Sequence, residues 1–453
     1  MLVYDLIANC LCFLDIHYFD KEKNRYFESE YFRGEKITQH LSDMKKLCII
    51  VFILSFVIQQ LNSQNKEKKD RPDMNKFVPE MFSFAAFQFE YALKCVDKAL
   101  AERVHNDQVT PRTINKDGSL KLVGPRDWCS GFFPGSLWFM YRFTGETKWK
   151  QQARRFSELI ETEQFDETSH DVGFKMYNSF GQGFELTGDS YYKDVVIQSA
   201  KTLIKRFNKK IGSIRSWDWN ASVWQYPVII DNMMNLELLF ETARLTGDST
   251  FYNIAVTHAD TTLKNHFRSD FSSFHVVDYD TITGNVRHKQ TFQGYSDPSA
   301  WARGQAWALY GFTMSYRYTG RPDYLNQAEG IADFIFSHPN LPSDLIPYWD
   351  FDDPKIPDVP RDVSAACITV SALYELSTYS SQNKDEYINK GDQILINLAK
   401  NYRAKRGTNQ GFLLLHSTGH LPGNSEIDVP INYADYYFLE ALIRRKAILD
   451  KLR

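Results

Sequence analysis

The chain has 453 residues, of which 43% are hydrophobic and 15% aromatic, and its formal net charge at pH 7 is −3. The chain length predicts one large domain or two or three smaller ones. The apolar share is ample for a buried core. A nearly balanced charge excludes the basic stripe that a nucleic-acid-binding protein needs, and we expect no nucleic-acid partner. The excess of tryptophan and tyrosine fits a saccharide cleft.

The N-terminal part of the chain predicts a secretory signal that starts inside the sequence. Met44-Lys45-Lys46 precedes an apolar run, Leu47 to Ile58, which is too short for an ordinary spanning helix and ends in a small polar exit. We therefore expect a spurious upstream extension (1–43), a signal peptide (44–63), a linker (64–77) and one folded domain (78–453). The protein would be secreted across the inner membrane to the periplasm, with no stable membrane insertion after cleavage. The alternative is a genuine cytosolic arm, 1–43, before a membrane anchor.

Helical spacing of apolar residues dominates the chain from Val78 onward. Twelve helices are predicted, at 79–104, 134–143, 148–163, 173–187, 190–208, 228–246, 249–266, 301–319, 322–338, 362–380, 384–401 and 432–451. Four of them end in a Thr-Gly pair followed within a few residues by Trp or Tyr, and glycine at such a place suits a left-handed helix cap before a tight reversal. These pairs are Thr144-Gly145, Thr187-Gly188, Thr246-Gly247 and Thr319-Gly320. The shared pattern favours repeated helical hairpins over four unrelated caps.

Loop lengths alternate along the predicted helices. Connections from an even-numbered helix to the next odd one are short, whereas most of those from odd to even are long. In an up–down array all long loops emerge at one end, and long loops in compact domains are usually functional. Six hairpins closing into a ring would gather these loops over one pocket. The N-termini of the even helices would point at this pocket and favour an anionic ligand.

Two aspartates in these loops are the best acid/base candidates. Asp171 lies in HDVGF and Asp231 in IIDNMMN, and glycoside cleavage commonly uses a pair of carboxyl groups. Apolar neighbours of Asp231 would raise its pKa towards that of a working acid. The alternative for either residue is a helix N-cap.

The stretch Gln293–Gly311, QGYSDPSAWARGQAWALYG, places a guanidinium between two indoles. Arg303 and Trp307 are four residues apart and share a helix face, so they could bind a carboxylate and stack on its ring. The alternative is a core-facing tryptophan and an ion-paired arginine.

The histidines and cysteines give little sign of a metal or a disulfide framework. His416 and His420 in HSTGH resemble a metal pair but lack a clear third ligand, and no HExxH pattern occurs. Past the signal, only Cys95, Cys129 and Cys367 remain, an odd and sparse set that matches neither a disulfide framework nor a zinc site. We expect Cys129 to be partly exposed and the other two to be core residues.

Over residues 79 to 453 the chain resembles glycoside hydrolase family 88, the unsaturated glucuronyl hydrolases. The resemblance lies in HDVGF (170–174), RSWDW (215–219), IIDNMMNLELL (229–239), the Gln293–Gly311 stretch, RDVSA (361–365) and NYADYYFLEAL near the C-terminus. It implies an all-α fold, an (α/α)6 barrel of six helical hairpins in a toroid. No metal or organic cofactor would be needed. The related unsaturated rhamnogalacturonyl hydrolases fit HDVGF and WARGQAW less well.

The resemblance also implies roles for individual residues. Asp231 would be the general acid/base and Asp171 its essential partner. The implied substrate-binding residues are Trp128, His170, Trp217, His275, Gln293, Arg303, Trp307 and His420. Within this set, Arg303 would lie near the substrate carboxylate, Trp128 and Trp307 would form walls, and Trp217 would be a stacking platform for the next sugar. Gly419 stands where family members often have an aromatic residue, which would widen the leaving-group side.

The reaction implied is hydration of a C4=C5 double bond in a non-reducing uronic acid on oligosaccharides made by polysaccharide lyases. The leaving sugar would come from a glycosaminoglycan or from a marine polysaccharide such as ulvan. Three alternatives stay open. Two are enzymes on the same barrel: a conventional inverting glycosidase, which would cleave saturated sugars, and an unsaturated rhamnogalacturonyl hydrolase. The third is a non-catalytic sugar-binding protein.

Overall fold

The structure is a computed structural model that describes Lys46 and residues 72–452. The chain divides into two compact units, Met1–Arg71 and Pro72–Arg453. The expected extension (1–43), the expected signal peptide (44–63) apart from Lys46, and residues 64–71 of the expected linker (64–77) lie outside the described residues. Within the described part, no helix is long and apolar enough to cross a membrane.

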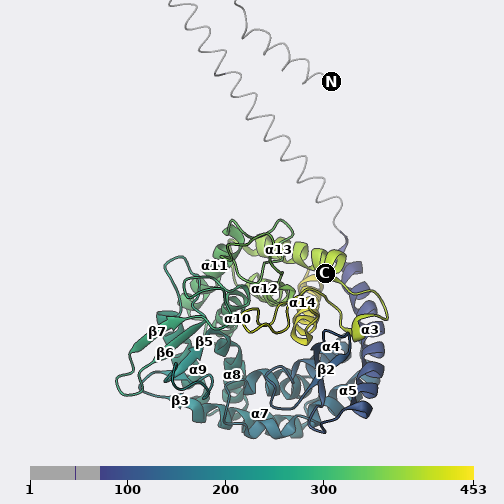
Figure 1. The fold of residues 1–453 in the computed structure, drawn as a ribbon, viewed down its shortest axis with the longest axis horizontal. Coiled ribbons are helices and arrows are strands. Elements are labelled where there is room, and N and C mark those ends of the chain that lie inside the picture. Colours follow the sequence, from purple (N-terminus) through teal and green to yellow (C-terminus); the bar gives the residue numbers. More distant parts are fainter. Residues whose placement is uncertain (1–45, 47–71, 453) are drawn as a thin grey trace, which may run out of the picture. The chain divides into compact units, whose positions relative to one another are not determined.

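Twelve main helical segments of the second unit alternate between an outer and an inner ring (Figure 1). The outer helices are α3 (Met74–Glu102), α5 (Thr147–Glu158), α7 (Ser190–Leu203), α9 (Ser249–Asn265), α11 (Pro322–Ser337) and α13 (Lys384–Asn397). The inner helices are α4 (Phe132–Thr144), α6 (Gln182–Thr187), α8 (Leu236–Thr246), α10 (Ala302–Thr319), α12 (Val363–Leu376) and α14 (Asn432–Lys451). The ring closes because α14 packs against both α12 and α4. The predicted (α/α)6 barrel is confirmed.

Several predicted helices differ in detail from the observed ones. The first begins at Met74, earlier than expected, because Asp73 caps it by accepting the N–H of Asn75. Two inner helices start with a differently wound segment: π-helical η2 (Gly173–Gly181) precedes α6, and 3-10 η4 (Ile230–Asn235) precedes α8. Similar short segments are η1 (Glu161–Phe165), η3 (Ile204–Arg206), η5 (Leu398–Tyr402) and η6 (Asn409–Gly411).

The four Thr-Gly helix ends are confirmed as left-handed caps. Their glycines have φ between 64° and 73°, and each glycine N–H donates to the carbonyl four residues back at 2.8 Å. In each pair the threonine hydroxyl donates to the carbonyl of the preceding turn at 2.7–2.8 Å. The same hydroxyl accepts the N–H two residues ahead. The chain therefore reverses within a few residues at each of these ends.

Short strands form in the long loops. β1 (Thr110–Ile114) pairs with β2 (Leu120–Val123), and β3 (Phe207–Asn208) pairs with β4 (Ser213–Ile214), both antiparallel. An antiparallel three-stranded sheet has the order β5 (Pro227–Ile229), β6 (Val276–Tyr279), β7 (Val286–Gln290), with Ile229 opposite Val276. The predicted helix from 228 was wrong at its start, because Val228 and Ile229 are β-branched and pair with β6. This strand ends two residues before Asp231.

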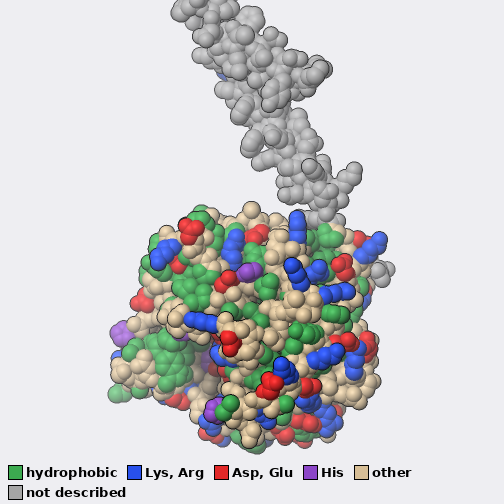
Figure 2. All heavy atoms as spheres, turned by 45° about the vertical axis from the view of Figure 1, so that its right-hand side comes forward, with side chains coloured by type: hydrophobic (Ala, Val, Ile, Leu, Met, Phe, Trp, Pro, Cys, Tyr) green, Lys and Arg blue, Asp and Glu red, His purple; other side chains and the backbone are tan. Residues whose placement is uncertain are grey.

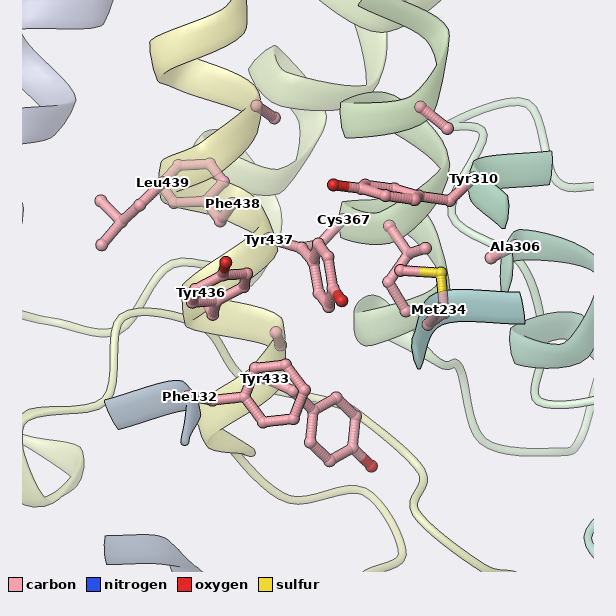
Figure 3. Packing of buried hydrophobic residues seen from close by; sticks show 14 of the residues in the cluster. Phe132, Met234, Ala306, Tyr310, Cys367, Tyr433, Tyr436, Tyr437, Phe438 and Leu439 are labelled. Atoms are coloured by element: carbon pink, nitrogen blue, oxygen red, sulfur yellow. The ribbon is translucent and has the colours of Figure 1, made fainter. Parts of the chain in front are cut away.

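Aromatic side chains fill the centre of the barrel. Figure 3 shows Phe132 of α4 beside Tyr433, Tyr436 and Tyr437 of α14, with Cys367 of α12 in the same cluster. Tyr433 lies at one end of this group, with its hydroxyl directed away from the other labelled rings (Figure 3). On the surface, acidic and basic side chains are interspersed over the face shown in Figure 2, in line with the nearly balanced formal charge.

The three cysteines among the described residues are free thiols. Cys367 is buried as expected, and Cys95 is half-buried. The expectation that Cys129 is partly exposed was wrong, since it has no exposed surface and its thiol donates to an oxygen of Asp127 at 2.9 Å.

Candidate active site

One cavity of about 260 Å³ collects most of the residues singled out in the sequence. Asp171 and Asp231 both line it, although they come from different hairpins. Six of the other predicted residues line it too: Trp128, His170, Trp217, Gln293, Arg303 and His420. All of these residues precede or begin inner helices, so the N-terminal ends of those helices surround the cavity. His275 and Trp307 are not in its wall.

A larger hollow of about 500 Å³ lies elsewhere, toward the C-terminal ends of inner helices. None of the predicted site residues lines it. Its charged side chains pair with one another: Arg317 contacts Glu237 at 2.9 Å and Glu375 at 2.8 Å, and Arg444 contacts Glu375 at 2.8 Å. Size alone does not identify an active site. We place the chemistry in the smaller cavity, which is lined by both Asp171 and Asp231.

Asp231 is the most perturbed acid of that cavity. The strand β5 brings it to the cavity, and only 8% of the residue is exposed. Burial raises its pKa from 3.8 to about 7, opposed by the positive charge of Arg303 and reinforced by the negative charge of Asp171. Its Oδ2 has no hydrogen-bond partner within the described residues. The indole of Trp307 lies close enough to favour the ionised form of Asp231, although its N–H has no hydrogen-bond partner among the described residues. Near neutral pH this carboxyl can both give and take a proton.

Asp171 is held more firmly. Its Oδ2 accepts the hydroxyl of Ser169, and its Oδ1 lies 3.3 Å from Nε2 of His170. Burial lowers the pKa of that histidine, so the ring is neutral at pH 7. The Asp171 side chain is 20% exposed and remains in contact with solvent.

A close backbone contact fixes the two carboxylate segments against each other. The N–H of Phe174, three residues after Asp171, donates to Oδ1 of Asn235 at 2.9 Å. Asn235 closes the 3-10 segment that contains Asp231. A Cβ at Gly173 would lie 2.6 Å from the Cα of Asn235, so only glycine allows this approach.

His275 contacts Asp231 from outside the cavity wall. Its Nδ1 accepts the N–H groups of Phe292 at 3.0 Å and Gln293 at 3.1 Å. The ring proton therefore sits on Nε2, which lies 3.8 Å from Oδ2 of Asp231. Burial lowers the pKa of His275 well below its usual value, so the ring is a neutral donor beside the acid.

Arg303 and Trp307 differ from their predicted arrangement. The Arg303 guanidinium, 1% exposed, binds Asp362 at 2.7 Å and the carbonyls of Thr418 (2.6 Å) and Gly419. Its charge is thus compensated by a carboxylate of the protein, although it still lines the cavity. Trp307 is fully buried and packs against Phe174 and Tyr437, so the expectation that it forms a cavity wall was wrong.

The exposed indole of RSWDW belongs to Trp219 and not to Trp217. Trp217, predicted as a stacking platform, is 8% exposed because Trp219 stacks on it with ring centroids 4.8 Å apart and planes 15° apart. Trp219 is 48% exposed and lines the cavity. Sequence reasoning missed it, although a second tryptophan two residues after Trp217 was a usable sign.

The C-terminal loop closes another side of the cavity. Gln293 Nε2 donates to the carbonyl of Gly419 at 3.2 Å, and Nε2 of His420 bonds the carbonyl of Phe292 at 3.0 Å. The expected widening at Gly419 was wrong, because a Cβ there would lie 2.7 Å from Oε2 of Glu426. This glutamate side chain fills the space.

Glu426 belongs to a buried ion-pair network that the sequence did not reveal. Arg112 donates to both of its oxygens at 2.5 and 2.6 Å, and donates to Asp127 at 2.6 and 2.8 Å. The Arg112 guanidinium also lies 6.0 Å from the ring centroid of Trp128. Both Arg112 and Glu426 line the cavity, as does Tyr433.

His416 and His420, weighed above as a metal pair, have other partners. Nδ1 of His416 lies 2.6 Å from Asp428, and His420 faces a backbone carbonyl. Across the part of the chain that the structure describes, no group of three or more His, Cys, Asp or Glu side chains is arranged to hold a metal ion.

Comparisons with known proteins agree with this fold. The model of the Glycosyl Hydrolase Family 88 matches residues 100–403. An "Unsaturated glucuronyl hydrolase" of Formosa agariphila is 47% identical over 412 residues, which cover 90% of this chain and 100% of that protein. An "Unsaturated chondroitin disaccharide hydrolase" of Streptococcus pneumoniae is 32% identical, over 75% of this chain and 86% of its own. The crystal structure of an "unsaturated glucuronyl hydrolase specific for heparin" superposes with a TM-score of 0.78 at 44% identity, covering 83% of this chain and 98% of that one.

Proposed function

Because this chain belongs to Glycosyl Hydrolase Family 88, we propose that its cavity releases a 4,5-unsaturated uronic acid from the non-reducing end of oligosaccharides. The enzyme is an unsaturated glucuronyl hydrolase, a glycosidase. The observation that carries the proposal is Asp231, a buried carboxyl whose pKa is raised to about 7 in the same cavity as Asp171.

The chemistry follows from that raised pKa. A protonated Asp231 can deliver its proton to C4 of the vinyl ether, which leaves positive charge at C5 shared with the ring oxygen. The Asp231 carboxylate then takes a proton from water as the water oxygen bonds to C5. The hemiketal so formed opens, and the sugar attached at C1 leaves. One water is consumed, and Asp231 regains its proton, so the same group acts first as acid and then as base.

The neighbours of Asp231 support this cycle. The neutral His275 faces it with an N–H and adds no positive charge that would hold the carboxyl ionised. Asp171 adds a negative charge that favours the protonated acid and offers oxygens to substrate hydroxyls or to the attacking water. The surrounding helix N-termini favour the negative charge of a uronate.

The substrate class is supported by the relatives. They include a chondroitin disaccharide hydrolase and a heparin-specific glucuronyl hydrolase, and we propose that this chain acts on unsaturated glycosaminoglycan-type fragments. Ulvan-type fragments are the alternative. A panel of lyase-generated oligosaccharides, each paired with its saturated counterpart, tests the reaction type. We expect loss of ultraviolet absorbance with unsaturated substrates only. Equal cleavage of saturated uronosides would favour a conventional inverting glycosidase instead.

Secretion to the periplasm is also proposed, and only the Met44–Gln64 pattern supports it. N-terminal sequencing of the protein from its native host should give a start near Gln64. A mature protein that retains Met1 or Met44 would contradict the proposal.

A further inference from the structure

An exposed indole at the rim of the cavity has no part in the reaction described above. Trp219 is 48% exposed, and among the described residues it is the only tryptophan in the set of exposed large apolar side chains. A single exposed apolar residue needs no explanation on a protein surface. This one lines the catalytic cavity and rests on other aromatic rings, which sets it apart.

The rings beneath Trp219 hold it in one orientation. Its centroid lies 4.8 Å from that of Trp217, 5.4 Å from that of Trp224 and 5.1 Å from that of Phe292. Trp224 is itself anchored, because its Nε1 donates to Oε1 of Gln290 at 3.1 Å. A ring fixed in advance loses little conformational freedom when a ligand stacks on it.

The backbone places Trp219 outward from the catalytic carboxyls. Trp217 forms a bridge with Ser169, whose hydroxyl binds Asp171, so Trp217 lies beside the segment that carries this acid. Trp219 stacks on Trp217 with ring centroids 4.8 Å apart, so it continues the aromatic surface by one ring. The rise in exposure from 8% at Trp217 to 48% at Trp219 indicates that this direction leads to solvent.

The charges next to Trp219 are already paired. Asp218 accepts from Arg206 at 2.8 and 3.0 Å, and Arg215 lies 3.2 Å from it. The exposed indole therefore presents an apolar face, and sugar rings stack on such faces through their C–H groups.

We propose that Trp219 forms an outer saccharide subsite, which stacks on a sugar beyond the disaccharide that contains the cleaved bond. The subsite takes neutral or charged pyranose rings alike, since its contact is apolar. It makes the enzyme favour longer oligosaccharides over disaccharides. This inference rests on the proposed function, because it assumes that the unsaturated end of the chain lies at Asp231.

The test compares unsaturated di- and tetrasaccharides prepared from one polymer with one lyase. Trp219→Ala should lower kcat/KM for the tetrasaccharide about tenfold through a higher KM, because the ring on which the outer sugar stacks is lost. For the disaccharide, the same variant should lower kcat/KM by less than about twofold. Trp219→Phe, which keeps a stacking ring, should recover most of the tetrasaccharide rate. Phe87→Ala, at a 45% exposed position on α3 away from the cavity, serves as the control and should change neither.

Equal losses on both substrates, or no loss on either, would overturn the subsite. A lower thermal midpoint of Trp219→Ala would not invalidate the test. The ratio of kcat/KM for the tetrasaccharide to kcat/KM for the disaccharide does not depend on the amount of folded enzyme, and it can be measured for Trp219→Phe as well. Failure of the proposed function gives a different result: the parent protein would then consume neither unsaturated substrate.

Discussion

Replacing Asp231 by asparagine should change the stability of the protein in a pH-dependent way. Asp231 has a folded-state pKa of about 7 against a usual value of 3.8, a rise of about three pH units. Between these two values the folded protein binds a proton that the unfolded chain has lost, so its stability falls as pH rises from about 4 to about 7. Asparagine removes this dependence while keeping the size of the side chain.

The magnitude follows from the shift. One pH unit corresponds to about 1.4 kcal/mol, so burial of ionisable Asp231 costs about 4 kcal/mol at pH 8 but only about 1.5 kcal/mol at pH 5. The free energy of unfolding of Asp231→Asn, relative to the parent, should therefore rise by about 3 kcal/mol between these conditions. Other carboxyl groups with a raised pKa, such as Glu237 in the larger hollow, are present in both the parent and the variant. Their contributions cancel when the two free energies of unfolding are subtracted.

Urea unfolding followed by tryptophan fluorescence at both pH values provides the assay. Asp248→Asn is the control, because the N–H of Thr250 lowers the pKa of this exposed carboxyl below its usual 3.8. Asp248 is therefore ionised in both the folded and the unfolded protein at pH 5 and at pH 8, and its replacement should change the free energy of unfolding equally at the two pH values. A difference between Asp231→Asn and the parent that is the same at pH 5 and pH 8 would refute the raised pKa.

Three further predictions concern activity and packing. The value of kcat/KM should fall tenfold per pH unit above about pH 7, as Asp231 loses its proton, and a profile that stays flat to pH 9 would contradict the acid role. Gly173→Ala should lower the free energy of unfolding by about 1–3 kcal/mol and reduce kcat at least about tenfold, since a Cβ there meets Asn235; unchanged kcat would show that this contact does not position the carboxyls. Arg303→Met should lower the free energy of unfolding by about 3–5 kcal/mol, because Asp362 is left as an uncompensated buried charge. A loss below about 1 kcal/mol would mean that water reaches the Asp362 carboxylate.

Local patterns in the sequence predicted the repeated helical hairpins, and the family resemblance implied that they form a barrel. A Thr-Gly helix end depends on a threonine hydroxyl and on a glycine in the left-handed conformation. Both residue types can be read directly from the sequence. Alternating loop lengths then predicted that Asp171 and Asp231 would meet, although they are far apart in the chain. These two features needed no knowledge of tertiary contacts.

Long-range pairing explains what the sequence did not reveal. Asp362 lies 59 residues from Arg303 and compensates its charge, so a free guanidinium could not be distinguished from a paired one. β-branched residues before Asp231 fit a helix or a strand, and only β6 decides between them. The same holds for Trp217 and Trp219, because nothing local determines which indole covers the other.

Ultraviolet absorbance of an unsaturated disaccharide, followed with the parent and with Asp231→Asn, tests the central claim most directly. We expect the parent to abolish the absorbance of the double bond and the variant, folded as shown by its unfolding curve, to be at least about a hundredfold slower. A variant that removes the double bond at nearly the rate of the parent would show that another group delivers the proton.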